Sequence, residues 1–455
     1  MVHELTDFLS RTPSAFHAIE NLSIMLSGAG FVRLTEGEKW DVQRGGAYFV
    51  TRNLSSLIAF RVPEDGFTSA RIAASHSDSP VFKIKENAEL TVINRYVQLN
   101  TERYGGMIFS TWLDRPLSVA GRALVRTKSG LETRLVNLDE DTLVIPNVPI
   151  HMNRSINDGY KYNAQADLMP LFGSIDAKNT FKARVAAACG AKVEDLLGTD
   201  LFLYSRVQPA VWGKDGEFVS AGRLDDLECA YTTARAMIEC KATKGMPVLA
   251  VFDNEEVGST TKQGADSTFL TDVLRRAALC LGVDGEAFYR AQASSVMLSC
   301  DNAHAAHPNH PELYDASNRV YMNEGIVIKE SANQKYTSDG ASKAILRAIL
   351  DNAGVEVSVL CQPLRHARRR HAGQYLQRAL LAEHRGHRPR AAGHALQLGD
   401  CRFPRRGRDG GWRACVLRNA HLHARRRRFR AELNAYSYGS LRESIPEGCF
   451  YAEGL

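Results

Sequence analysis

Apolar and polar residues follow helical and strand periods along the first 360 residues of the chain. Residues 10–30 place apolar side chains on one helix face and end at two glycines, so the pattern predicts a helix there. Short runs rich in β-branched and aromatic residues predict strands at 48–51, 57–62 and 70–74. The chain therefore begins with a helix followed by strands.

The pattern changes between about residues 86 and 215. Short alternating runs, as at 89–93, 123–126 and 142–145, are separated by many turn residues. Alternation with a period of two is typical of half-buried strands, so we interpret this stretch as a β-rich insertion.

Helices and buried strands alternate after the insertion. The predicted helices lie at 227–238, 269–281 and 342–350, and the predicted strands at 248–252 and 295–299. This alternation is typical of an α/β sheet with largely parallel strands. The expected parts are 1–85 and 216–360 for an α/β domain, 86–215 for the insertion, and 361–455 for a tail with no predicted structure.

The composition excludes several classes of protein. With 44% hydrophobic and 24% charged residues, the 455-residue chain is neither collagen-like, nor disordered, nor a small disulfide-rich domain. No window approaches 18 uninterrupted apolar residues, and the N-terminus lacks a secretory pattern, so we expect a cytoplasmic protein without membrane contact. Nine cysteines without a Cys-x-x-Cys pair indicate free thiols.

The net charge of +6 is unevenly distributed. Residues 361–430 hold 19 arginines, no lysine and three acidic residues, a net +16, which leaves −10 for the rest of the chain. A mildly acidic protein thus carries a basic tail of different character. Clustered arginines attract phosphate, so one interpretation is a nucleic-acid-binding arm, but absent lysine and few aromatic residues argue against it.

Acidic residues and histidines follow several predicted strands, at the strand ends where open α/β sheets build their sites. His76 comes just after the strand at 70–74, and Asp78 lies two residues further on. A carboxylate beside a histidine can fix the orientation of a metal-binding imidazole. Taken alone, a histidine at a strand end is more often structural.

Three more acids have similar positions. Asp225 begins a predicted helix, where aspartate is also an ordinary N-cap residue. Glu255 and Glu256 directly follow the strand at 248–252. Neighbouring side chains of an extended chain point to opposite sides, so one glutamate could bind a metal while the other faces substrate as a base. A solvated loop is the alternative.

Asp301 follows the strand at 295–299, and His304 comes three residues later. The combined set of one histidine and several carboxylates offers the nitrogen and oxygen ligands that suit zinc or a similar divalent ion. Two metal ions that share a bridging carboxylate would account for the number of acids.

At these residues the chain resembles the aspartyl aminopeptidase family of cytosolic exopeptidases with two cocatalytic zinc ions. The resemblance covers residues 1 to about 360. The matching segments, in order, are 14–18, 76–80, 112–117, 150–154, 223–227, 254–259, 301–309 and 334–336.

The resemblance implies a set of metal ligands. Asp225 would bridge two zinc ions, His76 and Asp301 would complete one site, and Glu256 would serve the other. His151, inside the insertion, would be either a metal-site or a substrate-side residue. The implied fold is a zinc-exopeptidase-like mixed sheet flanked by helices, with an inserted β-rich domain through which homo-oligomers assemble.

The resemblance also implies catalytic roles. Glu255 would be the general base in the attack of a metal-bound hydroxide on the first peptide bond, and Asp78 would orient the histidine ligand. His304 would stabilise the tetrahedral intermediate or hold substrate. Lys329 and Lys335 are candidates to bind an acidic side chain, because the family typically removes acidic N-terminal residues.

The resemblance stops near residue 360. An Arg-(Ser/Ala)-Asp-x-x-x-Gly-Ser-Thr motif and a Met-His-Ser motif, whose histidine is the remaining zinc ligand, are both missing. A shifted reading frame across 366–375 and 394–396 permits both, so we hypothesise a frameshift near codons 355–365. As written, the chain would lack a zinc ligand and the last core strands. Its hydrolysis would then be impaired, and an inactive relative that acts in binding or assembly is the alternative.

Overall fold

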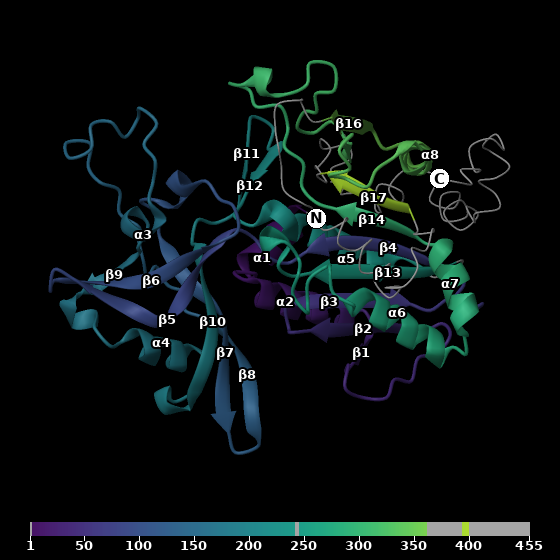
Figure 1. Ribbon diagram of the computed structural model, residues 1–455, viewed down its shortest axis with the longest axis horizontal. Helices are drawn as coiled ribbons and strands as arrows, with labels where there is room; N and C mark the ends of the chain where they lie inside the picture. Colours follow the sequence, from purple (N-terminus) through teal and green to yellow (C-terminus); the bar gives the residue numbers. More distant parts are fainter. Residues whose placement is uncertain (1, 242–244, 362–393, 400–455) are drawn as a thin grey trace.

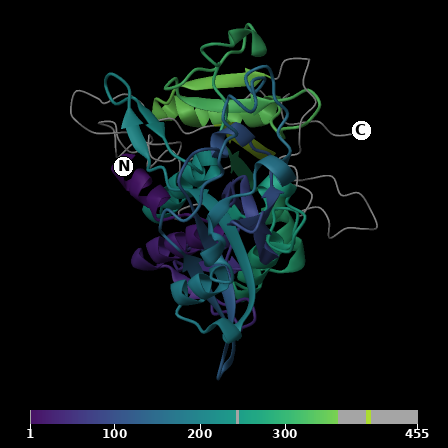
Figure 2. The ribbon, with the colours of Figure 1, turned by 90° about the vertical axis from the view of Figure 1, so that its left-hand side faces the viewer.

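Two separate sheets organise the protein. The computed structural model describes residues 2–241, 245–361 and 394–399. A nine-stranded mixed sheet is flanked by helices, and a six-stranded antiparallel sheet lies beside it (Figure 1). In Figure 2 the six-stranded sheet faces the viewer, in front of the nine-stranded one. The expected mixed α/β fold with a β-rich second part is confirmed.

The nine-stranded sheet has the order β1-β2-β3-β13-β4-β14-β17-β15-β16. Its centre is parallel, because β4 pairs in parallel with both β13 and β14, so the carboxyl ends of these three strands meet at one edge. The bounds are β1 Val32–Leu34, β2 Ala47–Arg52, β3 Ser56–Arg61, β4 Ala70–His76, β13 Met246–Phe252, β14 Val296–Cys300, β15 Ile326–Glu330, β16 Val357–Cys361 and β17 His394–Gly399.

Helices cover both faces of this sheet. Alternate residues of a strand face opposite sides, and in β13 both sets are buried: Val248 packs towards α6 and α7, and Leu249 towards α1, α2 and α5. Burial on both faces explains the continuous apolar run that predicted this strand. The helices are α1 Val2–Ser10, α2 Ala15–Gly28, α5 Leu224–Glu239, α6 Phe269–Cys280, α7 Gly285–Ala293 and α8 Gly340–Ala353.

The first predicted helix is wrong in its bounds. Residues 10–30 contain the end of α1 and the whole of α2, with a break that includes Pro13. Proline lacks the backbone donor that a helix interior needs and restricts the residue before it, so the chain leaves the helix and restarts after Ser14.

The six-stranded sheet has the order β8-β7-β10-β5-β6-β9, with antiparallel pairs throughout. Its strands are β5 Val81–Val92, β6 Tyr96–Tyr104, β7 Leu117–Thr127, β8 Gly130–Asn137, β9 Leu171–Ser174 and β10 Leu196–Ser205. The remaining elements are the hairpin β11 Ala210–Trp212 and β12 Phe218–Ser220, the helices α3 Ala164–Asp167 and α4 Phe181–Ala188, and the 3₁₀ turns Phe109–Trp112, Ile175–Ala177, Val193–Asp195, Glu255–Val257 and Pro311–Leu313.

One arginine fastens the two sheets together. Arg122 of β7 donates to the backbone oxygen of Asn53, in the turn after β2, at 2.8 Å and to Asp200 of β10 at 2.9 Å. Its guanidinium also lies 4.4 Å from the ring centre of Phe16 in α2. This combination of charge, hydrogen bonds and ring contact sets the position of the six-stranded sheet.

The sequence analysis assigns no structure to the tail after residue 360, and the structure describes one strand in it, at 394–399. These residues form β17, which pairs in parallel with β14 and antiparallel with β15. Strand pairing uses backbone groups that every residue except proline carries, so a side-chain pattern does not reveal it. The rest of the tail, from 362 to 393 and from 400 onward, lies outside the described residues.

Among the helices that the structure describes, none combines the length and the apolar character needed to cross a bilayer.

Replacement of Gly121 by alanine tests the packing of the six-stranded sheet. Gly121 of β7 has φ +157°, and a Cβ there would lie 1.9 Å from the backbone oxygen of Asp200. The strands must separate to admit it, so we expect Gly121→Ala to lower the free energy of unfolding by about 1–3 kcal/mol. Urea unfolding of the full chain measures this change. The control is Gly198→Ala in β10, where a Cβ meets nothing within 4 Å. Equal midpoints for the two variants would contradict the packing argument.

Candidate metal centre

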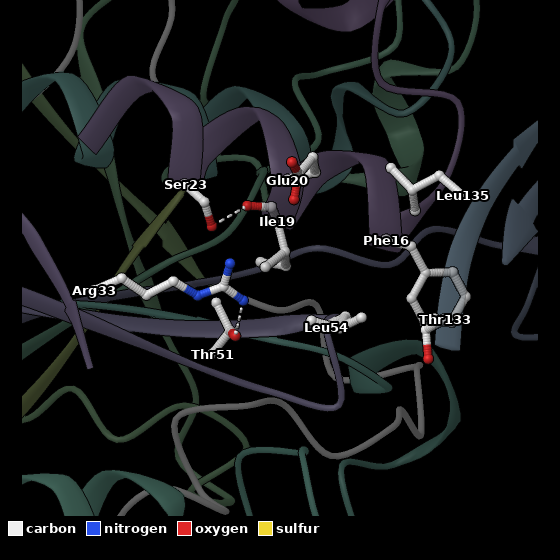
Figure 3. A pocket seen from close by; sticks show the side chains of 9 residues that line it. All are labelled: Phe16, Ile19, Glu20, Ser23, Arg33, Thr51, Leu54, Thr133 and Leu135. Carbon is white, nitrogen blue, oxygen red and sulfur yellow. Dashed lines mark hydrogen bonds between the residues drawn. The ribbon is translucent and has the colours of Figure 1, made fainter. Parts of the chain in front are cut away.

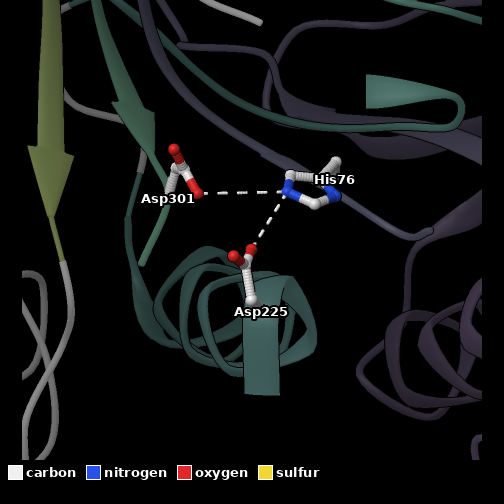
Figure 4. Close-up of side chains that lie close together, drawn as sticks. All are labelled: His76, Asp225 and Asp301. Atoms are coloured by element: carbon white, nitrogen blue, oxygen red, sulfur yellow. Dashed lines mark ion pairs between the residues drawn. The ribbon is translucent and has the colours of Figure 1, made fainter. Parts of the chain in front are cut away.

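Three of the predicted ligands converge at the carboxyl edge of the nine-stranded sheet. His76 ends β4, Asp301 follows the last residue of β14, and Asp225 lies in the first turn of α5. The imidazole Nε2 of His76 lies 3.2 Å from Asp225 Oδ1 and 4.0 Å from Asp301 Oδ1 (Figure 4). Among the described residues, this is the one group of three or more potential ligands whose donor atoms all lie within 4.8 Å of one another.

The donor set fits zinc. One imidazole nitrogen and two carboxylate oxygens are ordinary zinc ligands, and bonds of about 2.0–2.2 Å in a tetrahedral arrangement place ligand atoms roughly 3.3 Å apart. The 3.2 Å separation between His76 and Asp225 is close to this value, and the 4.0 Å separation between His76 and Asp301 is longer. His76 is 2% exposed whereas the Asp225 side chain is 52% exposed, so the site is closed behind the imidazole and open beside Asp225.

The orientation of His76 is fixed from behind. Its Nδ1 lies 3.0 Å from the backbone oxygen of Asp78 and 3.3 Å from Asp78 Oδ1. Because both of these atoms are acceptors, Nδ1 donates its proton to them, and Nε2 is the ring nitrogen that faces Asp225 and Asp301. Burial would lower the pKa of His76, but the carboxylates of Asp226, Asp225 and Asp78 raise it well above its ordinary value. A cation at Nε2 therefore enters a strongly negative environment.

Asp78 organises the loop that carries the two glutamates. Its carboxylate accepts hydrogen bonds from the Tyr104 hydroxyl at 2.6 Å and from the backbone N–H groups of Glu255 and Glu256, each at 3.1 Å. Burial would raise the pKa of Asp78, but hydrogen bonds from His76 and Tyr104 hold it below its ordinary value. One buried carboxylate thus positions both the histidine ligand and the glutamate turn.

The glutamates lie in a 3₁₀ turn, Glu255–Val257, rather than in an extended segment. The argument from alternating side chains therefore does not apply to them. Both are half-buried, and burial raises the pKa of Glu256 to about 8. Neither belongs to the three-ligand group, so a ligand role for Glu256 and a base role for Glu255 stay predictions.

Lys329 of β15 contacts a ligand directly. Its ammonium donates to Asp301 Oδ2 at 2.8 Å and to the backbone oxygen of Asn302 at 2.7 Å, and the residue is 3% exposed. The Tyr336 ring centre lies 5.9 Å from the same ammonium, and the neighbouring Lys335 is half-buried. Lys329 therefore fixes the outer oxygen of Asp301, while its predicted contact with substrate stays a prediction.

The two remaining candidates lie outside the three-ligand group. His304 is exposed, with its ring centre 5.9 Å from that of Tyr314. His151 is exposed in the loop between β8 and α3. The roles expected for both histidines stay predictions.

Two residues of the site were missed by the sequence analysis. Tyr104 ends β6 of the six-stranded sheet, and its contact with Asp78 could not be expected from local pattern. Asp226 is fully buried, and its Oδ2 accepts from the backbone N–H of His76 at 3.0 Å. Burial raises the pKa of Asp226 well above its ordinary value. The two consecutive aspartates at the start of α5 could have indicated a second role in the site, because capping a helix requires only one aspartate.

The chain is similar to known zinc metalloproteases. Residues 8–382 match the family described as aminopeptidase I zinc metalloprotease (M18), about twenty residues beyond the resemblance seen in the sequence. A probable M18 family aminopeptidase 2 from Clostridium acetobutylicum is 46% identical over 361 residues, which are 77% of this chain and 83% of that protein.

Solved structures are similar in fold. One described as the complex of Ape4 and Nbr1 has a TM-score of 0.81 at 30% identity, covering 88% of this chain and 79% of that one. Another, described as the mApe1 dodecamer of S. cerevisiae, has a TM-score of 0.73 at 23% identity, covering 88% and 90%. The second likeness concerns the fold alone.

Replacement of Asp78 by asparagine tests how the metal centre is positioned. The amide keeps the size of the side chain but turns donor hydrogens towards groups that also donate. We expect a loss of zinc affinity of about 10–100-fold, the usual effect of changing the partner of a metal-bound histidine. Competition with a chromophoric chelator measures the affinity.

The matched control is Tyr104→Phe, which removes one hydrogen bond to Asp78 and leaves the charge of Asp78 unchanged. It should weaken zinc binding much less than Asp78→Asn. Unchanged affinity in Asp78→Asn, with a normal unfolding transition, would show that the carboxylate does not position the ligands.

Proposed function

The chain belongs to the M18 aminopeptidase I family of zinc metalloproteases, and we propose on this basis that it removes N-terminal residues, preferentially acidic ones, from peptides. The observation that carries the proposal is the convergence of His76, Asp225 and Asp301 at the carboxyl edge of the sheet. The half-exposed Asp225 leaves one side of this group open to a peptide.

The proposed metal content of an intact family member is two zinc ions that share Asp225. His76 and Asp301 would hold the first ion, and Glu256 the second. Zinc supplies Lewis-acid polarisation of a carbonyl and acidifies a bound water. The exposed carboxylate of Asp225 supports this proposal. Burial, together with the charges of Asp225 and Glu255, raises the pKa of Glu256 to about 8, so this carboxyl group lies in a negative environment that favours a cation.

The side chains of the chain have distinct proposed roles. Glu255 would take a proton from the attacking water. Its backbone N–H donates a hydrogen bond to Asp78 at 3.1 Å, which holds this residue beside the proposed metal ligands. Asp78 would keep the His76 proton on Nδ1. His304 would contact the substrate at the open edge, and His151 would complete the metal site or face the substrate.

The acidic preference would come from a lysine near Asp301. Lys329 already donates to Asp301 and Asn302. Lys335 is the neighbour in sequence of Tyr336, whose ring contacts Lys329. No described residue forms an ion pair with the ammonium of Lys335. Lys335 is therefore the better candidate for a substrate carboxylate.

The missing family motifs bear on how active this chain is. The histidine expected for the second zinc is absent from the sequence as written, and the segment that would carry it lies largely outside the described residues. We expect one tightly held zinc per chain and slow hydrolysis. Two tightly held ions in atomic absorption would contradict this expectation.

A homo-oligomer is also proposed, formed through the six-stranded sheet and its loops. Large apolar side chains are exposed there, with Ile93 75% and Met152 80% exposed, and such side chains mark association surfaces when they cluster.

We expect Ile93→Glu to lower the sedimentation coefficient of the full chain. Ile24→Glu is the control, because Ile24 is 60% exposed on α2. A monomeric parent chain would refute the proposal.

The substrate preference is tested by comparing aspartyl and leucyl p-nitroanilides. The parent chain should hydrolyse the aspartyl compound with the higher kcat/KM. Lys335→Gln removes the charge proposed to meet the substrate carboxylate, so the ratio of the two kcat/KM values should fall about tenfold, which corresponds to ~1.4 kcal/mol. Steady-state assays with added zinc provide the measurement.

The matched control is Lys128→Gln, at the exposed tip of the β7–β8 hairpin. It should leave the ratio unchanged. A preference for the leucyl compound would contradict the acidic specificity. A zinc-loaded chain that hydrolyses neither compound would favour the inactive assembly protein instead.

A further inference from the structure

A cavity of about 180 Å³ lies apart from the metal centre, where elements of both sheets meet. Residues of α2 form one wall, β1, β2 and the turn after β2 form another, and β8 of the six-stranded sheet closes it. None of the proposed ligands or catalytic residues lines it. The cavity is therefore a second concave site with its own chemistry.

Two side chains of opposite charge line the cavity. Glu20 of α2 and Arg33 of β1 both reach it, and both are exposed at its rim (Figure 3). Arg33 donates to the Thr51 hydroxyl at 3.2 Å. No described residue forms an ion pair with either Glu20 or Arg33. Two unpaired charges of opposite sign on one small cavity form a receptor for a zwitterion.

Apolar side chains line the part of the cavity away from Arg33. Phe16 and Leu135 lie there, next to the hydroxyl side chain of Thr133, as Figure 3 shows. Ile19 and Leu54 line the middle of the cavity. Phe16 and Ile19 are buried, so this part of the cavity is fixed by the core of the protein. A ligand with a charged head and an apolar side chain matches this division.

We propose that this cavity binds a free α-amino acid with an apolar side chain. Its carboxylate would pair with Arg33, its ammonium with Glu20, and its side chain would lie against Phe16 and Leu135. A cavity of about 150 Å³ accepts benzene, so 180 Å³ suits an aliphatic amino acid.

The position of the cavity gives binding a consequence. Leu54 is next to Asn53, which Arg122 fastens to the six-stranded sheet, and Leu135 belongs to that sheet. A ligand that contacts both residues bridges the junction. Binding to the folded chain alone raises its stability, so the amino acid should increase the temperature of unfolding.

Calorimetric titration of the full chain with L-leucine tests the proposal. Chelation of metal beforehand removes the ions that could hold an amine at the metal centre, so the remaining saturable binding belongs to the cavity. Arg33→Gln and Glu20→Gln should each weaken it about fivefold, the size of an exposed ion pair. N-acetyl-L-leucinamide, which carries neither charge, should not bind.

Arg290→Gln serves as the matched control, because it removes an exposed arginine in α7 that does not line the cavity. It should bind L-leucine as the parent does. Absence of saturable binding up to tens of millimolar would overturn the proposal. So would an affinity of Arg33→Gln and Glu20→Gln equal to that of the parent chain, or binding of the uncharged analogue as tight as that of L-leucine. Each outcome is independent of hydrolysis.

Discussion

The buried carboxylate of Asp78 is the point at which three separate parts of the chain meet. It follows β4, accepts the Tyr104 hydroxyl from the six-stranded sheet, and accepts the backbone N–H groups of Glu255 and Glu256 after β13. A charge removed from water must be compensated by donors, and here the donors come from distant segments. The candidate metal ligand His76 takes its orientation from the same residue.

The six-stranded sheet consequently takes part in the site. Tyr104 reaches Asp78, and Gly105 approaches Glu256 so closely that a Cβ on this glycine would lie 3.0 Å from the Cβ of Glu256. Arg122 fastens the same sheet to Asn53 at a second place. These contacts, of Tyr104 with Asp78 and of Arg122 with Asn53, lie at separate points and resist rotation of one sheet against the other. A ligand in the cavity between α2 and β8 would lie next to the contact of Arg122 with Asn53.

Much of the catalytic half of the fold could be predicted from sequence because its central strands are buried on both faces. Short runs rich in apolar residues predicted β4, β13 and β14, and the polar residues just after β4 and β14 supplied His76 and Asp301. Neighbouring parallel strands then bring these residues together without further information. The placement of β13 between β3 and β4 is long-range and has no local pattern.

Other features could not be predicted for identifiable physical reasons. Tyr104 contacts Asp78 through tertiary packing of two sheets. The glutamate turn is a 3₁₀ turn begun by Asn254 with φ +66°, a left-handed conformation that asparagine adopts more readily than most residues. β17 pairs through its backbone with β14 and β15, which no local side-chain pattern indicates.

The most direct test of the central claim is anomalous X-ray diffraction at the zinc edge from crystals of the full chain grown with zinc. The account predicts an anomalous peak bonded to His76 Nε2 and to carboxylate oxygens of Asp225 and Asp301, at about 2.0–2.2 Å from each. Zinc found only elsewhere, for example on the exposed pair His307 and His310, would contradict it.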